Sequence, residues 1–130
     1  ITGRMACFAN YTYTDARNEV GDNEDRYLPH FPRHMGNAGL EYTHSPRWGA
    51  SLTGHFVGSA YLDDANTARR DSYVTVDALG WYEKSVFRVF AEVENLFDED
   101  YYTYGYLRAG TKYFSPAAGT TFTAGLSVKF

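Results

Sequence analysis

The sequence has no long apolar run, only one cysteine and no excess of positive charge. No stretch approaches the roughly 18 consecutive apolar residues of a membrane-spanning helix, and the mean hydropathy is −0.46. A single cysteine among 130 residues excludes an internal disulfide and a zinc site with several cysteine ligands. The net charge of −4 argues against a nucleic-acid-binding protein, which normally carries a basic stripe. Sustained helical periodicity is also missing, which favours a chain built from strands.

Aromatic residues, by contrast, are abundant. They make up 18% of the chain, with 12 tyrosines and 9 phenylalanines. This composition suits strands and interfaces, because a tyrosine ring has one apolar and one polar end. The terminal stretch TTFTAGLSVKF alternates strictly between apolar and polar side chains. Because side chains of a strand point to opposite faces with a period of two, its large apolar residues share one face: Phe122, Leu126, Val128 and Phe130.

Similar alternation recurs along the chain and predicts an antiparallel meander of six strands. The connections between the extended segments are long, short, long, short and long in turn. Outer-membrane β-barrels show this rhythm, because they have long external loops and short periplasmic turns. Both chain ends would then lie on the periplasmic side. The six segments comprise residues 4–17, 36–44, 48–62, 72–83, 85–97 and 120–130.

Charged side chains occupy the polar faces of two neighbouring segments. Asp77 lies on the polar face of one, and Arg88, Glu92 and Glu94 lie on the polar face of the next. Such charges would be costly in a dry core unless each were paired. They fit the watery lumen of a membrane barrel, and they also fit the solvent-exposed face of a soluble sheet. Aromatic residues near the strand ends favour the barrel, whose interfaces carry aromatic girdles.

Several motifs resemble those of one known family, in the same order. VFAEVENLFDEDYYTYG is similar to the penultimate-strand signature of TonB-dependent outer-membrane receptors, and YTYTDAR, LPHFPRHMGNAGLEY, FVGSAYLDDANT and SPAAGTTFTAGLSVKF are similar to other strands and loops of the family. Within the signature, we expect Asn95 and Asp98 to form the turn where the strand leaves the bilayer. Leu96 and Phe97 would anchor that strand at the interface, and Tyr101 completes the motif.

The resemblance implies a fold and a location. The family's barrel has about 22 strands around a plug domain, so residues 1–130 are expected to form its C-terminal segment in the Gram-negative cell outer membrane, without the plug and the earlier strands. On its own, this all-β segment should be an open, curved, six-stranded antiparallel sheet. Phe122, Leu126, Val128 and Phe130 match the family's terminal assembly signal. The barrel-assembly machinery, outer-membrane lipid and lipopolysaccharide are the partners that follow from this location.

The resemblance also implies a function, the uptake of a scarce nutrient such as a ferric siderophore by a transport receptor that is not an enzyme. The full-length receptor would work with the TonB energy-coupling complex, and neither a cofactor nor a resident metal is expected. The substrate, an iron chelate or another small nutrient, would bind at the external mouth. The long aromatic loop before the last strand supplies the candidate contacts: Tyr102, Tyr104, Tyr106 and Arg108. The lumen-facing residues would be Asp77, Arg88, Glu92 and Glu94.

A hypothesis from another class stays open on the residues alone. A soluble all-β module that binds a small ligand would show the same alternation, with its apolar faces turned inward onto a core. The two hypotheses differ in the fate of four large side chains. The soluble module would bury them together, whereas a membrane barrel would leave them exposed to lipid: Tyr11, Phe56, Phe87 and Phe122.

Overall fold

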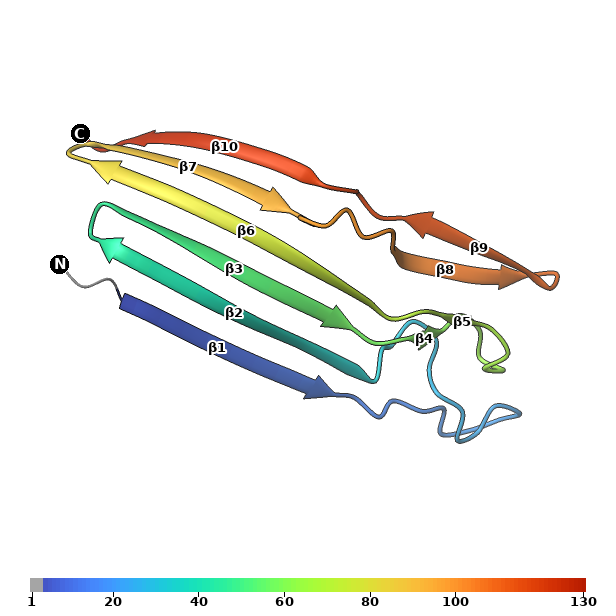
Figure 1. Ribbon diagram of the computed structural model, residues 1–130. Helices are drawn as coiled ribbons and strands as arrows, with labels where there is room; N and C mark the ends of the chain where they lie inside the picture. Colours follow the sequence, from blue (N-terminus) through green and yellow to red (C-terminus); the bar gives the residue numbers. More distant parts are fainter. Residues whose placement is uncertain (1–3) are drawn as a thin grey trace.

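The main element is an open antiparallel sheet of long strands. The computed structural model describes residues 4–130, and none of the elements in this span is a helix that could cross a membrane. Each long strand pairs with its neighbours along the chain in a six-stranded sheet of order β1-β2-β3-β6-β7-β10 (Figure 1). The predicted all-β meander is therefore confirmed. Its strands are β1 (Arg4–Tyr13), β2 (His34–Ser45), β3 (Trp48–Val57), β6 (Tyr73–Lys84), β7 (Phe87–Glu94) and β10 (Thr121–Val128).

The two ends of the sheet differ in their connections. Tight turns join β2 to β3 and β6 to β7 at one end, where β1 also begins and β10 ends (Figure 1). The three long connections gather at the opposite end. We call these the turn end and the loop end. The predicted alternation of long and short connections is confirmed.

Two short hairpins that the sequence analysis does not predict stand at the loop end. β4 (Ala60–Tyr61) pairs with β5 (Arg69–Arg70), and β8 (Tyr102–Arg108) pairs with β9 (Thr111–Pro116). The third strand also ends earlier than predicted, at Val57 rather than residue 62. The Gly58 N–H donates to the His34 carbonyl across the sheet (2.8 Å). A Cβ at Gly58 would lie 2.8 Å from the same oxygen, so a glycine allows the chain to turn away here.

The register gives the sheet one apolar face and one polar face. Residues opposite one another in paired strands share a face, so Val89 lies beside Leu126, and Arg88 lies beside Ser127 on the other side. The prediction that β7 and β10 agree on their apolar side is confirmed, although Phe130 follows the end of β10 and is not placed by this register. The apolar face continues across all six strands in rows such as Cys7, Leu40, Leu52, Ala78, Val93 and Phe122.

The apolar face is exposed rather than packed into a core. Within residues 4–130, the buried apolar side chains are Ala60, Leu62 and Ala68, all close to the β4–β5 hairpin. The long strands form a single layer (Figure 1), so the soluble alternative is wrong. The four side chains that it would bury together are instead exposed: Tyr11 64%, Phe56 39%, Phe87 53% and Phe122 68%.

Aromatic rings on the polar face lie over glycines of the neighbouring strand. In each pair, a Cβ on the glycine would overlap the ring, so the ring occupies the space that another side chain would need. The ring also covers backbone that the glycine leaves bare, which helps to fix the register of the two strands. The pairs are Phe8 over Gly39, Trp81 over Gly49 and Phe90 over Gly125.

Candidate functional site

Asn95 organises the point where β7 leaves the sheet. This side chain is only 4% exposed. Its backbone N–H donates to Asp77 Oδ1 (2.9 Å), its Nδ2 donates to the Glu99 carbonyl (3.0 Å), and its Oδ1 accepts from the Glu99 N–H (2.9 Å). The backbone has φ of +50°, which asparagine tolerates better than most residues because its short side chain bonds locally. One residue thus ties β6 to the chain that follows β7.

Asp98 joins the same turn to the start of β10. Its backbone is also left-handed, with φ of +53°, and its Oδ1 accepts from the Thr120 N–H (3.0 Å). Thr120 Oγ1 in turn donates to the Asn95 carbonyl (2.8 Å). A Cβ at Gly119 would come within 2.6 Å of Asp98 Oδ1, so a larger residue there would push the carboxylate aside. The turn after β7 and the entry to β10 therefore form one hydrogen-bonded unit.

Among residues 4–130, the side chains of the other motif residues make none of the hydrogen bonds of this unit. Leu96 and Phe97 are exposed, as side chains that contact an interface must be. Tyr101 lies at the loop end, where its ring packs on the ring of Tyr73 at 4.3 Å between centroids. The Arg70 guanidinium covers the Tyr73 ring at 5.1 Å from its centroid. Burial lowers the pKa of Arg70. These residues help to line a cleft of about 160 Å³.

The β8–β9 hairpin carries the candidate substrate contacts. Its register places Tyr106 opposite Tyr113, and the alternation along β8 puts Tyr104 and Arg108 on that same face. The rings of Tyr106 and Tyr113 are stacked at 5.1 Å. Tyr102 departs from this group, because the register shifts between it and Tyr104. Its ring stacks instead on Phe114, which follows Tyr113 and faces the opposite way (4.7 Å).

A residue from a distant loop joins the Tyr104 face. The ring of His30, in the connection between β1 and β2, stacks on Tyr104 at 4.7 Å between centroids. The backbone N–H of His30 donates a hydrogen bond to the backbone carbonyl of Tyr61 in β4 (2.8 Å). All three long connections therefore meet at the loop end, where the His30 and Tyr104 rings stack, and Arg108 shares the face of Tyr104 along β8. This arrangement suits an anionic ligand with flat or apolar surfaces.

A chain of contacting polar side chains crosses the polar face of the sheet from β1 to the turn after β7. Asn37 Nδ2 donates to Asn10 Oδ1 (3.0 Å), and Asn37 Oδ1 lies 2.7 Å from His55 Nδ1. His55 Nε2 lies 3.0 Å from Asp77 Oδ2, and the other oxygen of Asp77 accepts from the Asn95 N–H. Alternation predicts that these residues face inward, but the contacts depend on the register between strands. The sequence pattern alone therefore does not reveal that Asn10, Asn37 and His55 belong to one network.

All four predicted lumen residues lie on the polar face with this chain. Asp77 lies opposite Thr53, and Glu92 lies opposite Thr123. Glu94 lies opposite Thr121 on the same side. Arg88 lies nearer the turn end, opposite Glu83. Their role toward a lumen remains a prediction, since the sheet alone encloses no space.

The predicted assembly-signal residues lie at the edge strand. Phe122, Leu126 and Val128 alternate along β10 on the apolar face, and their side chains are exposed together with that of Phe130. The chain end is tied to the turn end of the sheet, because the Lys129 N–H donates to the Val86 carbonyl (2.9 Å) and Lys129 Nζ lies 3.0 Å from Glu83 Oε1. This edge is therefore accessible to a protein that recognises the last strand.

Comparisons with known proteins agree on one family. The family model described as TonB dependent receptor-like, beta-barrel matches residues 4–96. The pesticin receptor of Yersinia enterocolitica is 31% identical over 103 residues, which cover 73% of this chain and 15% of that protein. The ferrichrome outer membrane transporter/phage receptor of Escherichia coli K12 is 35% identical over 111 residues, which cover 78% of this chain and 15% of that protein. The chain thus spans about 15% of the length of these relatives.

Solved structures show the same fold. The ferric citrate transporter FecA in its unliganded form matches with a TM-score of 0.82 at 22% identity, over 95% of this chain and 21% of that one. The siderophore receptor PiuA from Acinetobacter baumannii matches with a TM-score of 0.81 at 24% identity, over 100% of this chain and 20% of that one. The open sheet therefore has the shape of a section of such a barrel wall.

Proposed function

Because the chain belongs to the TonB-dependent receptors of the Gram-negative outer membrane, we propose that residues 1–130 are the C-terminal barrel segment of a receptor that imports a ferric siderophore. The family consists of transport receptors, not enzymes. One observation carries the proposal: a single-layer sheet with an exposed apolar face and a hydrogen-bonded polar face. Lipid would cover the first face, and the watery interior of the barrel would meet the second.

The unpaired edges of the sheet support a place within a larger barrel. β1 and β10 each pair on one side only, and unpaired backbone groups are costly in lipid. In the whole receptor, further strands and a plug domain would complete the barrel. The exposed residues of β10 would present the signal that the barrel-assembly machinery reads, and the TonB energy-coupling complex would act on the plug of the full-length receptor.

The substrate class is supported by the loop end and by the relatives. Tyr104, Tyr106 and Arg108 gather on one face of the β8–β9 hairpin, beside His30. Aromatic rings and a guanidinium suit an anionic chelate, because a cation offers charge and the rings offer apolar surface. One curated relative is a ferrichrome transporter, and similar barrels belong to a ferric citrate transporter and a siderophore receptor. A ferric siderophore agrees with the functions of these relatives.

Uptake of radio-iron tests the proposal. We expect the full-length receptor, expressed in a Gram-negative strain without its own siderophore receptors, to take up at least one of a panel of ferric siderophores. Uptake should stop when TonB is deleted. Removing the hairpin of residues 102–116 should abolish siderophore binding while the receptor remains in the outer membrane. No uptake of any member of the panel, or uptake that does not need TonB, would refute the proposal.

A further inference from the structure

A small polar pocket lies on the polar face of the sheet, beside the turn that follows β7. It has a volume of about 150 Å³. Three strands supply its carboxylates and hydroxyls: Thr75 and Asp77 of β6, Glu94 at the end of β7 and Thr121 at the start of β10. Among residues 4–130, neither a lysine nor an arginine lines it. The pocket therefore gathers negative charge and oxygen atoms without a neighbouring lysine or arginine.

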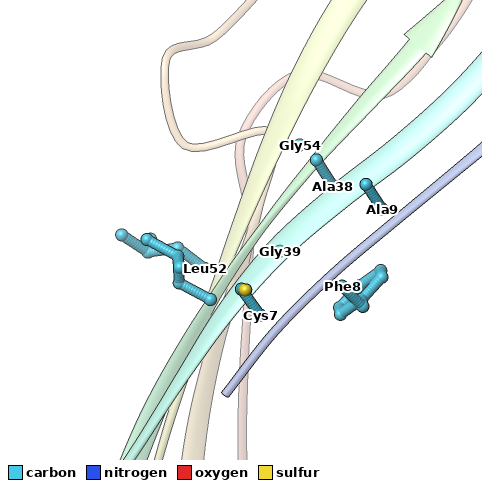
Figure 2. A pocket seen from close by; sticks show the side chains of 8 residues that line it. Cys7, Phe8, Ala9, Ala38, Gly39, Leu52 and Gly54 are labelled. Carbon is cyan, nitrogen blue, oxygen red and sulfur yellow. The ribbon is translucent and has the colours of Figure 1, made fainter. Parts of the chain in front are cut away.

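Asp77 belongs to the face of the sheet that Phe8 occupies. Cys7 lies on one side of the sheet and Phe8 on the other (Figure 2). From Phe8 the pairing runs through Gly39 and Thr53 to Asp77, so Phe8 and Asp77 share the polar face. A larger hollow of about 540 Å³ lies on the opposite face, among mostly apolar side chains. That hollow offers no carboxylate, so a cation would find ligands only on the polar face of these two.

The register brings Asp77 and Glu94 side by side. Ala78 pairs with Val93, so one residue farther along each strand Asp77 falls opposite Glu94. The next residue, Asn95, confirms this alignment, because its N–H donates to Asp77 Oδ1 (2.9 Å). Like charges directly opposite each other in a sheet are destabilising. A cation bound between the two carboxylates would remove this cost.

The charge of Glu94 is not compensated by the residues that the structure describes. None of the ion pairs formed among residues 4–130 includes it. Asp77 has one partner, since its Oδ2 lies 3.0 Å from His55 Nε2. Each carboxylate oxygen has two lone pairs, however, and can accept a further contact. Both carboxylates can therefore bind the same ion.

The Thr75 hydroxyl is independent evidence that the pocket takes a ligand. Thr75 is only 9% exposed and lines the pocket, yet it takes part in none of the side-chain hydrogen bonds formed among residues 4–130. A buried hydroxyl without a partner is costly, and its oxygen has lone pairs for a ligand. The Thr121 hydroxyl has only a long contact, 3.4 Å, to the Gly119 carbonyl. Both hydroxyl oxygens are therefore free to bind an ion.

We propose that this pocket binds one calcium ion through the carboxylates of Asp77 and Glu94 and the hydroxyls of Thr75 and Thr121, with water completing the shell. Oxygen ligands suit a hard cation, and calcium accepts about six to eight of them in flexible geometry, whereas magnesium demands a near-ideal octahedron. Water alone would satisfy the hydroxyls but would leave two negative charges side by side.

The bound ion would have a structural role. It would tie β6 to the end of β7 and the start of β10, which hydrogen bonds of Asn95 and Asp98 already join. The sequence analysis expects no resident metal, because only the register of three strands brings these ligands together. The inference goes beyond siderophore uptake and does not depend on the substrate that is imported.

Calcium binding to the purified full-length receptor in detergent tests the inference. After metals are removed with a chelator, isothermal titration with calcium chloride should include a site that Glu94→Gln weakens by about tenfold, since a charged ligand is lost. Thr75→Val keeps the shape of the side chain but removes its oxygen, and it should weaken the same site. Glu92→Gln is the matched control and should bind as the wild type does. Glu92 lies two residues away on the same face, opposite Thr123, and does not line the pocket.

Hydrogen exchange and heat stability separate loss of the ion from loss of folding. Calcium should slow exchange of the Leu96 and Thr121 amides in the wild type and in Glu92→Gln, but not in Glu94→Gln. Without calcium, Glu94→Gln should be at least as stable to heat as the wild type, because the repulsion with Asp77 is gone.

Two outcomes would overturn the inference. One is an equal calcium affinity of the Glu94→Gln and Glu92→Gln receptors, and the other is equal protection of these amides by the same concentration of magnesium. Because neither measurement uses a siderophore, a failure of radio-iron uptake would contradict the proposed function and leave the calcium result standing.

Discussion

Left-handed backbone at Asn95 and Asp98 turns a short polar motif into a joint between three strands. The side chain of each residue forms hydrogen bonds with backbone groups that would otherwise be unpaired at the end of a strand. Buried donors and acceptors without partners are costly, so these few side chains have a large effect on the stability of the joint. The same reasoning applies to Asp63, whose carboxylate closes the turn of the β4–β5 hairpin.

Replacing Asn95 tests the joint. Asn95→Ala should destabilise the region after β7 by about 3 kcal/mol, because Glu99 loses both of its partners and alanine is strained at positive φ. Hydrogen exchange of the full-length receptor in detergent should show faster exchange at Leu96 and Glu99. Asn95→Asp keeps an acceptor for the Glu99 N–H and should lose less. Unchanged exchange in the alanine variant would contradict the role of this side chain.

The pH dependence of the β4–β5 hairpin follows from Asp63. Partial burial raises the pKa of this carboxyl, but hydrogen bonds from the Thr67 and Ala68 N–H groups outweigh burial, and the net pKa lies below its ordinary value. The stabilisation is therefore complete above the pKa of the unfolded chain, about 3.9, and is lost as the pH falls through the folded pKa. Protection of the Ala68 amide should fall in that acidic range. Asp63→Asn should remove this pH dependence, and a transition at neutral pH would contradict the assignment.

At the scale of whole strands, the alternation of side chains with a period of two divides the residues between an apolar face and a polar face. Leu52 and Leu79 lie in neighbouring strands, but Leu52 opposes Leu40 on the apolar face, whereas Leu79 opposes Glu92 on the polar face. The same side chain therefore meets different surroundings within one sheet. The loop end repeats this separation in the β8–β9 hairpin, where Tyr104 and Tyr102 belong to different clusters.

The two leucines give a matched test of the faces. Leu52→Lys should destabilise the inserted receptor by about 3 kcal/mol, because it places a charge in the middle of the lipid-facing surface. Leu79→Lys should be tolerated beside Glu92. Chemical unfolding of the full-length receptor in lipid vesicles measures both changes. A larger loss for Leu79→Lys would mean that the two faces are assigned the wrong way round.

The two tyrosines of β8 give a matched test of the mouth. Tyr104→Ala should weaken binding of the ferric siderophore proposed as the substrate by about tenfold, since it removes both a ring from the candidate face and the stack on His30. Tyr102→Ala removes a ring that stacks on Phe114 and should have a smaller effect. Fluorescence quenching titration of the purified receptor compares them. If Tyr102→Ala proves the more damaging change, the hairpin presents its other face to the substrate.

At the scale of the molecule, the sheet has the two faces of a barrel wall, but it does not close into a barrel. β1 and β10 are edge strands, and each leaves a row of backbone donors and acceptors without partners in this chain. Water can satisfy those groups, but lipid cannot. In the proposed receptor, further strands would pair with these two edges and stabilise the barrel in a bilayer.

The isolated segment tests this dependence. Residues 1–130, refolded alone into detergent, should self-associate through β1 and β10 rather than remain a single species. Size-exclusion chromatography with light scattering gives the mass of the particle. A monodisperse monomer whose β1 amides resist exchange would show that the strands close on themselves, contrary to the open sheet.

The sequence predicted the parts of this fold that depend on local alternation. Val89 and Arg88 were assigned to opposite faces because a strand's period is two, and the register of β7 with β10 agrees. Contacts between strands were out of reach, because His55 meets Asp77 only once β3 and β6 are aligned. The β8–β9 hairpin was missed because its turn uses Ala109 and Gly110, with φ of 48° and 78°, in place of the usual asparagine–glycine signal of a type I′ turn.

The order of strands in space has a consequence for how the segment forms. Every long strand pairs with the long strand next to it in the chain, so each addition closes a loop of limited length and the entropic cost of closure stays small. The β2–β3 and β6–β7 pairs, each joined by a tight turn, have the shortest loops to close. These two hairpins can then pair through β3 and β6, and β1 and β10 can add on either side. The β8–β9 hairpin shortens the effective distance between β7 and β10 in the same way. Assembly can therefore proceed from the middle strands outward, and β1 pairs last. Its outer edge is then free to pair with a strand from the rest of the proposed receptor.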